Sequence, residues 1–353
     1  MSDSHIYNSS ISSRAIVLLD TYYDKLSHDI KKVGHCTEFL GKHSDYDTTR
    51  LLCQSRCMYF LIEYSIKRDD TQAFNHALTL YKHIKSDYYD AGNKQWLQFP
   101  KRQKLDNLYE YAFLVFSISK LYSAKKSDEY KKDLEELNSY ILRNYFKPET
   151  DFDNLKDKSG LVSQNALMHL FESYLELYKA IPDKAYLETL ITLLTSATKM
   201  FYDSQLDLIS EYSPFGDDNT IYEPGHSFEW GCLLLESEQL NLNLSNKINI
   251  KGLVASAEQY GVMSQGVVKQ SISNLNDKDR YRIWPMLERM RYYLMNQDAA
   301  KINNIFPEFN DIFINHQTKL PIEFVDSQLN QDFDGVKTTT SYHLINSLKH
   351  LIK

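Results

Sequence analysis

The sequence predicts a nearly all-α protein built from helical hairpins, and three observations favour this class. Its long segments carry apolar residues with a period of about 3.6, and the alternation typical of strands is rare. Only 11 Gly and 8 Pro interrupt the 353 residues, so breaks between helices are widely spaced. Distinctive polar and aromatic residues also recur at a nearly constant interval. Strands are therefore expected to be few and short.

The periodicity predicts twelve helices, which we take in order as six pairs. Polar, turn-rich segments separate them, at 91–94, 147–151, 213–219 and 326–332. None of these has the length or the Pro, Ser or charge content of an interdomain linker, so we predict a single domain over residues 1–353. The predicted helices are 9–31, 46–66, 70–88, 105–124, 127–145, 163–180, 183–202, 225–240, 250–266, 281–296, 300–316 and 338–352.

A positional repeat relates every second helix. The most distinctive residue near the start of each one follows its predecessor by 53, 60, 57, 58 and 59 residues, close to one sixth of the chain. Six hairpins that each contribute one helix start to the same end of a ring produce such an interval. The polar ends of the inner helices then line one central cleft. The residues are Arg56, Tyr109, His169, His226, Trp284 and His343.

Composition and charge exclude several function classes. The net charge of −7, with no face-wide basic stripe, disfavours a nucleic-acid partner. No apolar run approaches the roughly 20 residues that cross a membrane, and the N-terminus lacks a signal pattern. The four cysteines show neither metal-site nor disulfide-framework spacing. We therefore expect a cytoplasmic protein without a membrane partner.

The most informative stretch is Pro224-Gly225-His226, where a turn leads a histidine into an apolar helix. Glu229 follows His226 at i+3, so both side chains share one helix face. A histidine beside a carboxylate can be held in one tautomer with a pKa suited to acid/base work. The alternative is structural, with His226 as a hydrogen-bonded core residue and Glu229 favouring the helix dipole.

A second pair with the same spacing is His169 and Glu172. Three interpretations of these two pairs are open, namely a metal site, an acid/base pair or structural hydrogen bonding. Catalytic zinc sites commonly use two histidines of one helix in the motif His-Glu-x-x-His, whereas di-iron bundles use Glu-x-x-His. Neither spacing is present at these two pairs. We therefore predict no metal ligand.

Four further residues are candidates for the same cleft. His343, at the start of the last helix, is a candidate partner for His226, since two bases on opposite sides of a carbon suit proton abstraction and return. Arg56 lies in an apolar segment and either binds substrate oxygens or pairs with an acid such as Asp47 or Glu63. Trp284 stacks either on a sugar or in the core, and the same choice applies to Trp230.

Motifs for phosphate loops, dinucleotides and hydrolase elbows do not occur in the sequence. An inverting glycosidase needs two carboxylates with room for a water, and Glu172, Glu229 and Glu288 are available. The distinctive residues at the helix starts are nevertheless histidines, which favours proton transfer over hydrolysis.

Six motifs in one order resemble the N-acylglucosamine 2-epimerase superfamily, over about residues 45–350. The resemblance looks closest to the mannose isomerase branch, which includes proteins labelled mannose-6-phosphate isomerase-like. The motifs are Gln54-x-Arg56, Leu108-Tyr109-x-Tyr111-Ala112-Phe113, Asn165-Ala166-x-Met168-His169-Leu170-x-Glu172, Pro224-Gly225-His226-x-x-Glu229-Trp230, Trp284-Pro285-x-x-Glu288 and Tyr342-His343.

The resemblance implies an (α/α)6 barrel without a redox cofactor or essential metal. It implies that His226 and His343 are the general acid/base pair and that Glu229 supports His226. Arg56 and His169 would hold the hydroxyl at the enolised carbon. The substrate-binding residues predicted on this basis are Arg56, His169, Asn165, Tyr109, Phe113, Trp284, Glu288 and Trp230.

The function predicted is interconversion of an aldose such as D-mannose with its ketose, D-fructose, or its C2 epimer through a cis-enediol. An N-acylglucosamine 2-epimerase is the alternative enzyme. A catalytically silent, sugar-binding helical toroid is the alternative from another class, and an inverting glycosidase is more distant. The expected partner is a small sugar, and the expected state is a monomer or homodimer.

Overall fold

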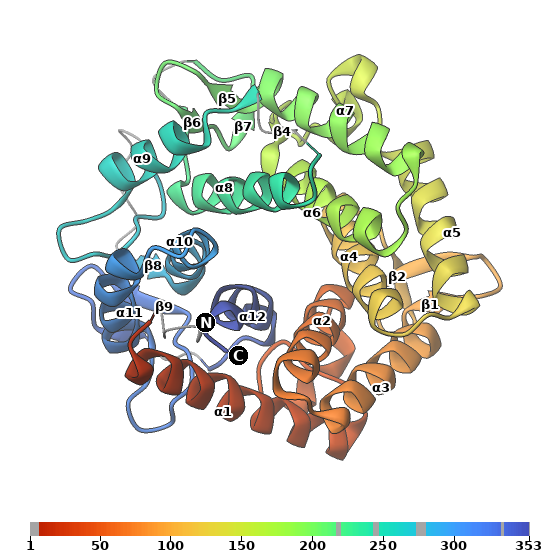
Figure 1. Ribbon diagram of the computed structural model, residues 1–353. Coiled ribbons are helices and arrows are strands. Elements are labelled where there is room, and N and C mark those ends of the chain that lie inside the picture. The colour runs from red at the N-terminus through yellow and green to blue at the C-terminus, as the bar shows by residue number, and fades with distance from the viewer. Residues whose placement is uncertain (1–6, 217–219, 243–246, 273–279, 333–334, 353) are drawn as a thin grey trace. The chain divides into compact units, whose positions relative to one another are not determined.

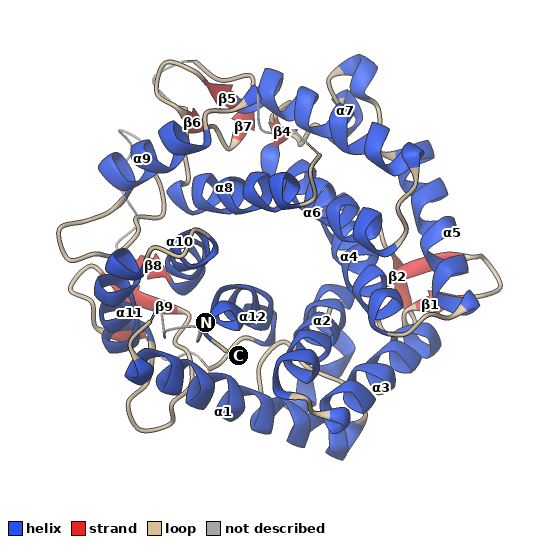
Figure 2. Cartoon of the chain, viewed as in Figure 1, coloured by secondary structure: helices blue, strands red, loops and turns tan. Residues whose placement is uncertain are grey.

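Twelve α-helices and ten short strands make up the regular structure of the described residues (Figure 2). The computed structural model describes residues 7–216, 220–242, 247–272, 280–332 and 335–352 (Figure 1). The predominance of helix and the shortness of the strands agree with the sequence prediction. Within these ranges no helix is both long and apolar enough to span a bilayer.

Contacts divide the chain into two compact units. The first unit comprises Met1–Leu105, Val262–Gln270 and Lys278–Lys353. The second unit comprises Asp106–Gly261 and Ser271–Asp277. Each is described by itself below, and the prediction of one domain stays a prediction.

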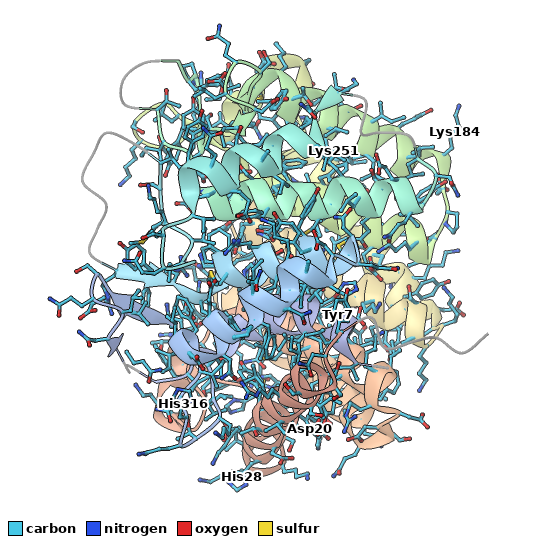
Figure 3. The ribbon with its side chains drawn as sticks, turned by 60° about the vertical axis from the view of Figure 1, so that its left-hand side comes forward. Tyr7, Asp20, His28, Lys184, Lys251 and His316 are labelled. Carbon is cyan, nitrogen blue, oxygen red and sulfur yellow. The ribbon has the colours of Figure 1, made fainter. Side chains whose placement is uncertain are left out.

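Two helix layers form the first unit, with α2, α10 and α12 in one layer and α1, α3 and α11 in the other (Figure 1). Residues 51–65 of α2 are all buried, as expected of a helix covered on all sides. By contrast, α1 buries one face and exposes side chains such as His28 (Figure 3). The helices are α1 Ser9–Val33, α2 Leu51–Arg68, α3 Thr71–Asp87, α10 Ile283–Met295, α11 Ala299–Phe313 and α12 Ser341–Leu348.

The second unit repeats this arrangement, with α4, α6 and α8 in one layer and α5, α7 and α9 in the other (Figure 1). Side chains at the starts of α7 and α9, such as Lys184 and Lys251, are exposed (Figure 3). Large apolar side chains of α6, among them Phe171 and Tyr174, are fully buried between the layers. The helices are α4 Leu108–Ala124, α5 Asp128–Asn144, α6 Gln164–Ala180, α7 Lys184–Phe201, α8 Pro224–Gln239 and α9 Ile250–Gly261.

Local capping and a proline fix where α4, α6 and α8 of the second unit begin. The Asn107 side chain accepts from the backbone N–H of Tyr109 at the start of α4, at 3.0 Å. The Ser163 hydroxyl accepts from the N–H of Asn165 in the same way on α6, at 3.3 Å. Pro224, with its fixed φ, occupies the first turn of α8. These caps place predicted site residues in or next to the first turns of their helices.

Four small antiparallel sheets lie between the helices. Two of them matter for the site. In one, β4 pairs with β7, with Val162 opposite Ser213, and in the other β8 pairs with β9, with Arg282 opposite Phe324. The strands are β1 Tyr89–Asp90, β2 Gln95–Phe99, β3 Arg102–Lys104, β4 Val162–Ser163, β5 Tyr202–Asp203, β6 Leu208–Ile209, β7 Tyr212–Ser213, β8 Arg280–Arg282, β9 Phe324–Asp326 and β10 Gln331–Asp332.

Three predicted helices differ from the observed ones by four or more residues at one end. The helix predicted over 46–66 begins at Leu51, because His43–Thr48 forms a 3₁₀ helix and the next two residues are extended. The helix predicted over 250–266 ends at Gly261, where the chain folds back and Val262 pairs with Val268. The helix predicted over 338–352 is α12 flanked by 3₁₀ turns on both sides.

Candidate active site

In the second unit His226 lies in the first turn of α8 and is 6% exposed. Its Nδ1 lies 2.6 Å from Oε1 of Glu211 and 3.5 Å from Oε2 of Glu223. Because a carboxylate only accepts, this contact keeps a proton on Nδ1 and leaves Nε2 for other chemistry. The carboxylate bonded to Nδ1 of His226 is therefore Glu211, which the sequence did not indicate, while the support of His226 by Glu229 stays a prediction.

Glu211 is positioned by backbone bonds and by a buried hydrogen-bond chain. It lies between β6 and β7, and its carbonyl accepts from the N–H of Gln164 at 3.0 Å. The Gln164 side chain donates to Oε1 of Glu211 at 3.3 Å and accepts from Nε1–H of Trp230 at 2.9 Å. All three side chains are buried. The orientation of the carboxylate on His226 is thus fixed by groups from α6 and α8.

The electrostatic surroundings of His226 favour its charged form. Burial lowers the pKa of His226, but the carboxylates of Glu211, Glu223 and Glu229 outweigh burial and raise this pKa to about 9. At neutral pH the imidazole is therefore mainly protonated. A protonated histidine next to a substrate can act as a general acid.

His169 forms a second buried histidine–carboxylate group in this unit. Its Nδ1 lies 3.0 Å from Oε2 of Glu172 on the same helix, and its Nε2 lies 3.9 Å from Oε1 of Glu229 on α8. The rings of Tyr109 and Phe113 on α4 pack against the imidazole at centroid distances of 5.0 and 4.7 Å. The structure therefore brings together five residues that were singled out in the sequence, namely Tyr109, Phe113, His169, Glu172 and Glu229.

Asn165 stands one turn before His169 on α6, so the two side chains share a helix face. Its Oδ1 is buried and has no hydrogen-bond partner within the described residues. A buried acceptor without a partner costs free energy unless a ligand or water bonds to it. A substrate hydroxyl is a suitable donor.

In the first unit His343 lies in the first turn of α12 and is 7% exposed. Its Nδ1 lies 2.6 Å from Oε1 of Glu288 on α10, which repeats the arrangement at His226. The other oxygen of Glu288 accepts from Nη1 of Arg291 at 3.2 Å. The charge of Glu288 is therefore shared between His343 and a cation.

Aromatic and cationic side chains surround His343. The rings of Trp284 and Tyr342 lie 5.5 and 4.6 Å from the imidazole. The Arg56 guanidinium lies over the Tyr342 ring at 5.0 Å and donates to the carbonyl of Thr339 at 3.4 Å. Arg56, Trp284, Glu288 and His343 are thus grouped by the structure, as the sequence predicted.

These contacts bear on two alternatives left open by the sequence. The contacts given for Arg56 are the Tyr342 ring and the Thr339 carbonyl, while Glu63 accepts from Lys349 at 3.3 Å. Trp230 is 1% exposed and packs on Phe171 at 5.5 Å, which favours the core interpretation over a sugar platform. Trp284, at 7% exposure beside His343, is better placed for a substrate.

Sequence reasoning missed Glu211, Gln164 and Arg291. Glu211 stands 15 residues before His226 and comes from a strand connection, so no helical spacing pointed to it. Arg291 follows Glu288 at i+3, and this spacing does indicate an ion pair. The turn-rich stretch before Pro224 was the available signal for Glu211, because such loops often carry site residues.

Within the described residues of the second unit, two groups offer the ligand types that a divalent cation accepts. In each, the ligand atoms lie within 4.8 Å of one another. One group is His169, Glu172 and Glu229, and the other is Glu211, Glu223 and His226. In both groups histidine–carboxylate contacts account for the close approach, as acid/base and structural pairs also do.

A hollow of about 390 Å³ lies elsewhere in the first unit, between α1 and α11. Arg14, Val17 and Asp311 contribute to its lining, together with His316 on the loop after α11 (Figure 3). None of the predicted site residues lines it. The chemistry of the histidine groups therefore outweighs this hollow in locating the site.

Comparison with known proteins gives concordant results. The sequence profile described as N-acylglucosamine 2-epimerase (GlcNAc 2-epimerase) matches residues 35–317. A cellobiose 2-epimerase from Ruminococcus albus is 23% identical over 265 residues, a segment that spans 66% of each chain. This chain thus covers slightly less than two thirds of that relative's length.

Solved structures share the fold at low sequence identity. A sugar epimerase from a ruminal bacterium matches with a TM-score of 0.81 over 97% of both chains, at 15% identity. A D-mannose isomerase matches with a TM-score of 0.76 over 99% of both chains, at 14% identity. The predicted fold class, an (α/α)6 barrel, is confirmed by this likeness. Because the family profile covers most of the sequence, the prediction of an enzyme is also confirmed, and the chain belongs to the N-acylglucosamine 2-epimerase family.

Proposed function

We propose that the protein is a sugar isomerase or epimerase that moves protons at C1 and C2 of an open-chain aldose. The observation that carries the proposal is a repeated one: a buried histidine in the first turn of a helix, with Nδ1 2.6 Å from a carboxylate, at His226 and at His343. Membership of an epimerase family supports the same chemistry. With Nδ1 engaged, Nε2 of each histidine is the atom available to a substrate.

The reaction proceeds through a cis-enediol. One histidine takes the C2 proton, and the electron pair from the C–H bond forms the C1–C2 double bond while the carbonyl oxygen at C1 is protonated. Return of a proton to C1, with loss of the proton on the C2 hydroxyl, gives the ketose. Return of a proton to the opposite face of C2, with loss of the proton on the C1 hydroxyl, restores the aldehyde and gives the epimer. Every proton removed is thus returned to the sugar or to a histidine, and no redox partner is needed.

The two histidines have different surroundings, which divides their roles. Carboxylates surround His226, and they hold it protonated at neutral pH. The carboxylate on His343 is shared with Arg291, so its field at the imidazole is partly offset. Pairs of groups whose surroundings differ in this way commonly divide acid and base roles. We assign His343 as the base that takes the first proton and His226 as the acid.

The other side chains hold the substrate. Asn165 offers a buried acceptor without a partner in the described residues, and His169 lies on the same face of α6. Arg56, held over Tyr342, offers guanidinium donors for the oxygen that becomes charged in the enediol. Oε1 of Glu229 lies 3.9 Å from Nε2 of His169, and we propose that Glu229 also orients that imidazole.

D-Mannose and D-fructose are the substrates that we propose first, because the D-mannose isomerase structure matches over 99% of both chains. The second candidate is epimerisation at C2 of a disaccharide, because the sequence relatives include cellobiose 2-epimerases. N-acetylglucosamine and N-acetylmannosamine are the third, from the description of the family.

Solvent deuterium uptake tests the proposal. Purified protein is incubated in heavy water with mannose, fructose, glucose, cellobiose and N-acetylmannosamine, and label at C1 or C2 is read by NMR. We expect uptake in at least one sugar, and its loss by at least 100-fold in His226→Asn and His343→Asn, as is typical when an acid/base group is removed. Glu238→Asn, an exposed change on α8, is the matched control.

Each outcome separates the alternatives. A sugar that binds but takes up no label indicates a binding toroid, and release of reducing ends from an oligosaccharide indicates a glycosidase. Uptake that is unchanged in both histidine variants contradicts the site assignment. Uptake that persists after EDTA treatment and dialysis is expected, since no step above requires a metal.

A further inference from the structure

Glu323 contacts the starts of two helices in the first unit. It lies directly before β9, and its backbone carbonyl accepts from the N–H of Ile283, the first residue of α10, at 3.1 Å. Its carboxylate accepts from the Thr340 hydroxyl at 2.6 Å, in the 3₁₀ turn Thr338–Thr340 that runs directly into α12. Both side chains are buried. One residue therefore connects the first residue of α10 to the residue before α12.

The second unit has a similar connection at Glu211. The carbonyl of Glu211 accepts from the N–H of Gln164, the first residue of α6, and its carboxylate contacts His226 in the first turn of α8. Glu211 follows α7 along the chain, as Glu323 follows α11. In each unit a glutamate thus bonds through its backbone to one helix and through its carboxylate to the start of the next helix of the same layer. The recurrence indicates that the carboxylate of Glu323 belongs to the arrangement that builds the site.

The two helix starts that are connected in the first unit carry groups of the proposed site. Trp284 is the second residue of α10, and His343 is the third residue of α12. Their rings lie 5.5 Å apart, so a shift of either helix start changes the packing of the indole on the imidazole. In the 3₁₀ turn, the carbonyl of Thr339 accepts from Arg56 at 3.4 Å. The hydrogen bond to the turn therefore acts on three side chains that the proposed reaction uses.

The contact between Thr340 and Glu323 is the stronger of the two side-chain contacts of this carboxylate. Its length of 2.6 Å is that of a charge-assisted hydrogen bond between a hydroxyl and a carboxylate. The other carboxylate oxygen accepts from Nη2 of Arg282 at 3.2 Å. The Arg282 side chain is partly exposed, so solvent screens this ion pair. We therefore expect the threonine contact to contribute most to the position of the turn.

We propose that Glu323 and Thr340 are positioning residues for the reaction, which hold Arg56 and His343 in the geometry that proton transfer requires. We call these two residues the Glu323 clamp. The inference rests on the proposed function and adds residues that act on it through the starts of α10 and α12. Small displacements of reacting groups slow the chemical step strongly, because that step depends on their distance and alignment. The clamp should therefore affect kcat more than KM.

Steady-state kinetics of two variants at one position test the clamp, with a sugar that takes up deuterium as substrate. Thr340→Val keeps the shape of the side chain and removes the hydroxyl donor, so we expect kcat to fall about tenfold while KM stays within about twofold of the wild type. Thr340→Ser keeps the hydroxyl and is expected to retain at least about half of kcat. Thr189→Val is the matched control, because Thr189 is similarly buried on α7 and its hydroxyl donates to the Ala185 carbonyl.

Two further variants separate the contacts of the Glu323 carboxylate. Glu323→Gln keeps a side-chain oxygen that can accept from Thr340, so we expect kcat to fall less than about threefold. Arg282→Gln removes the partly exposed ion pair and leaves the hydroxyl contact, so we expect a change of less than about twofold. The urea midpoint of each variant is measured alongside, so that kcat is compared among proteins that are folded under the assay conditions.

The possible failures are distinguishable. A wild-type kcat in Thr340→Val contradicts the clamp and leaves the proposed function standing, whether or not the urea midpoint falls. Equal losses of kcat in Thr340→Val and Thr340→Ser also contradict it, since the hydroxyl is then not responsible. A rise in KM with unchanged kcat assigns the contact to substrate affinity and overturns the positioning role. Absence of deuterium uptake in every sugar by the wild type overturns the proposed function together with this inference.

Discussion

At the scale of single residues, the protonation of His226 depends on acids from three places in the second unit. Glu211 lies between β6 and β7, Glu223 precedes α8, and Glu229 lies on α8. Glu211 lies 2.6 Å from Nδ1, nearer than Glu223 at 3.5 Å, and it is the first among the acids that raise the pKa of His226. It therefore has the largest effect on the charge of the imidazole, and the pH dependence of activity should report it.

The first prediction concerns the loss of activity at alkaline pH, the alkaline limb of the pH profile. A general acid must be protonated, so kcat/KM is expected to fall above about pH 9, the pKa of His226. Glu211→Gln removes an anion that favours the imidazolium, so the limb should move to lower pH. Deuterium uptake measured from pH 5 to pH 10.5 gives both profiles. Coincident limbs in the wild type and this variant contradict the role of Glu211, and Glu238→Gln serves as the exposed control.

Stability should depend on pH through the same residue. The folded pKa of about 9 is above the usual value of 6.5, so protonation of His226 stabilises the fold fully below pH 6.5, and this contribution is lost as pH rises through 9. The interval between the two values corresponds to about 3 kcal/mol. Urea unfolding at pH 6 and pH 9.5 should show that loss in the wild type but not in His226→Gln. Equal pH dependence in both proteins would rule out this linkage.

Residue-scale prediction from sequence had a clear limit. His226, His343, Arg56 and His169 were identified because their types and positions are unusual in apolar helices. The carboxylate that bonds to His226 was not identified, because helical spacing indicates only neighbours on one helix. Glu211 lies instead in the connection between two strands. Glu288 contacts Nδ1 of His343, a partnership that the sequence did not indicate, and its contact with substrate stays a prediction.

At the scale of elements, α6 and α8 are connected through the chain Trp230, Gln164 and Glu211. This connection lets the packing of two helices determine the orientation of a carboxylate on His226. A buried amide with both ends bonded has one preferred orientation, so the arrangement is rigid.

Trp230→Phe tests the chain with little loss of buried surface. Removal of the Nε1–H donor leaves Gln164 free to rotate, so we expect kcat to fall about tenfold while KM changes less than twofold, since loss of one buried hydrogen bond costs about 1–3 kcal/mol. The alkaline limb should also move toward lower pH. Phe171→Leu, which alters packing on Trp230 without touching the chain, is the control. An unchanged limb together with lowered stability would indicate a purely structural role.

Periodicity predicted which helices are present, but it predicted less well where each helix begins and ends. The end of α9 illustrates the reason. A Cβ on Gly261 would lie 2.3 Å from Cβ of Pro224, so close contact with the start of α8 requires glycine where α9 ends. The apolar pattern continues through Val262 and Val267, which are used instead in the fold-back of the chain. Periodicity does not distinguish apolar residues that continue a helix from apolar residues that are buried where the chain folds back.

At the scale of the whole molecule, the interval of about one sixth of the chain proved the most informative sequence signal. The residues that define it lie on α2, α4, α6, α8, α10 and α12, all of them helices of the same layer within their units (Figure 1). Tyr109, His226, Trp284 and His343 lie in first turns. The sequence therefore indicated both the hairpin repeat and the helix ends at which the proposed site residues lie. It did not indicate the short strands, since two-residue ladders leave no alternation to detect.

The single-domain prediction is tested by unfolding. The chain passes from one unit to the other four times, after Leu105, Gly261, Gln270 and Asp277, so neither unit is a continuous segment. Chains that cross repeatedly are expected to unfold cooperatively, unlike domains joined by one linker. Trp230 reports on the second unit, and Trp96 and Trp284 report on the first. Urea transitions from fluorescence of the wild type and of Trp230→Phe, and from far-UV circular dichroism, should share one midpoint. Midpoints that differ by more than about 0.5 M, at a slope of about 1–3 kcal/mol/M, would show two separately folding units.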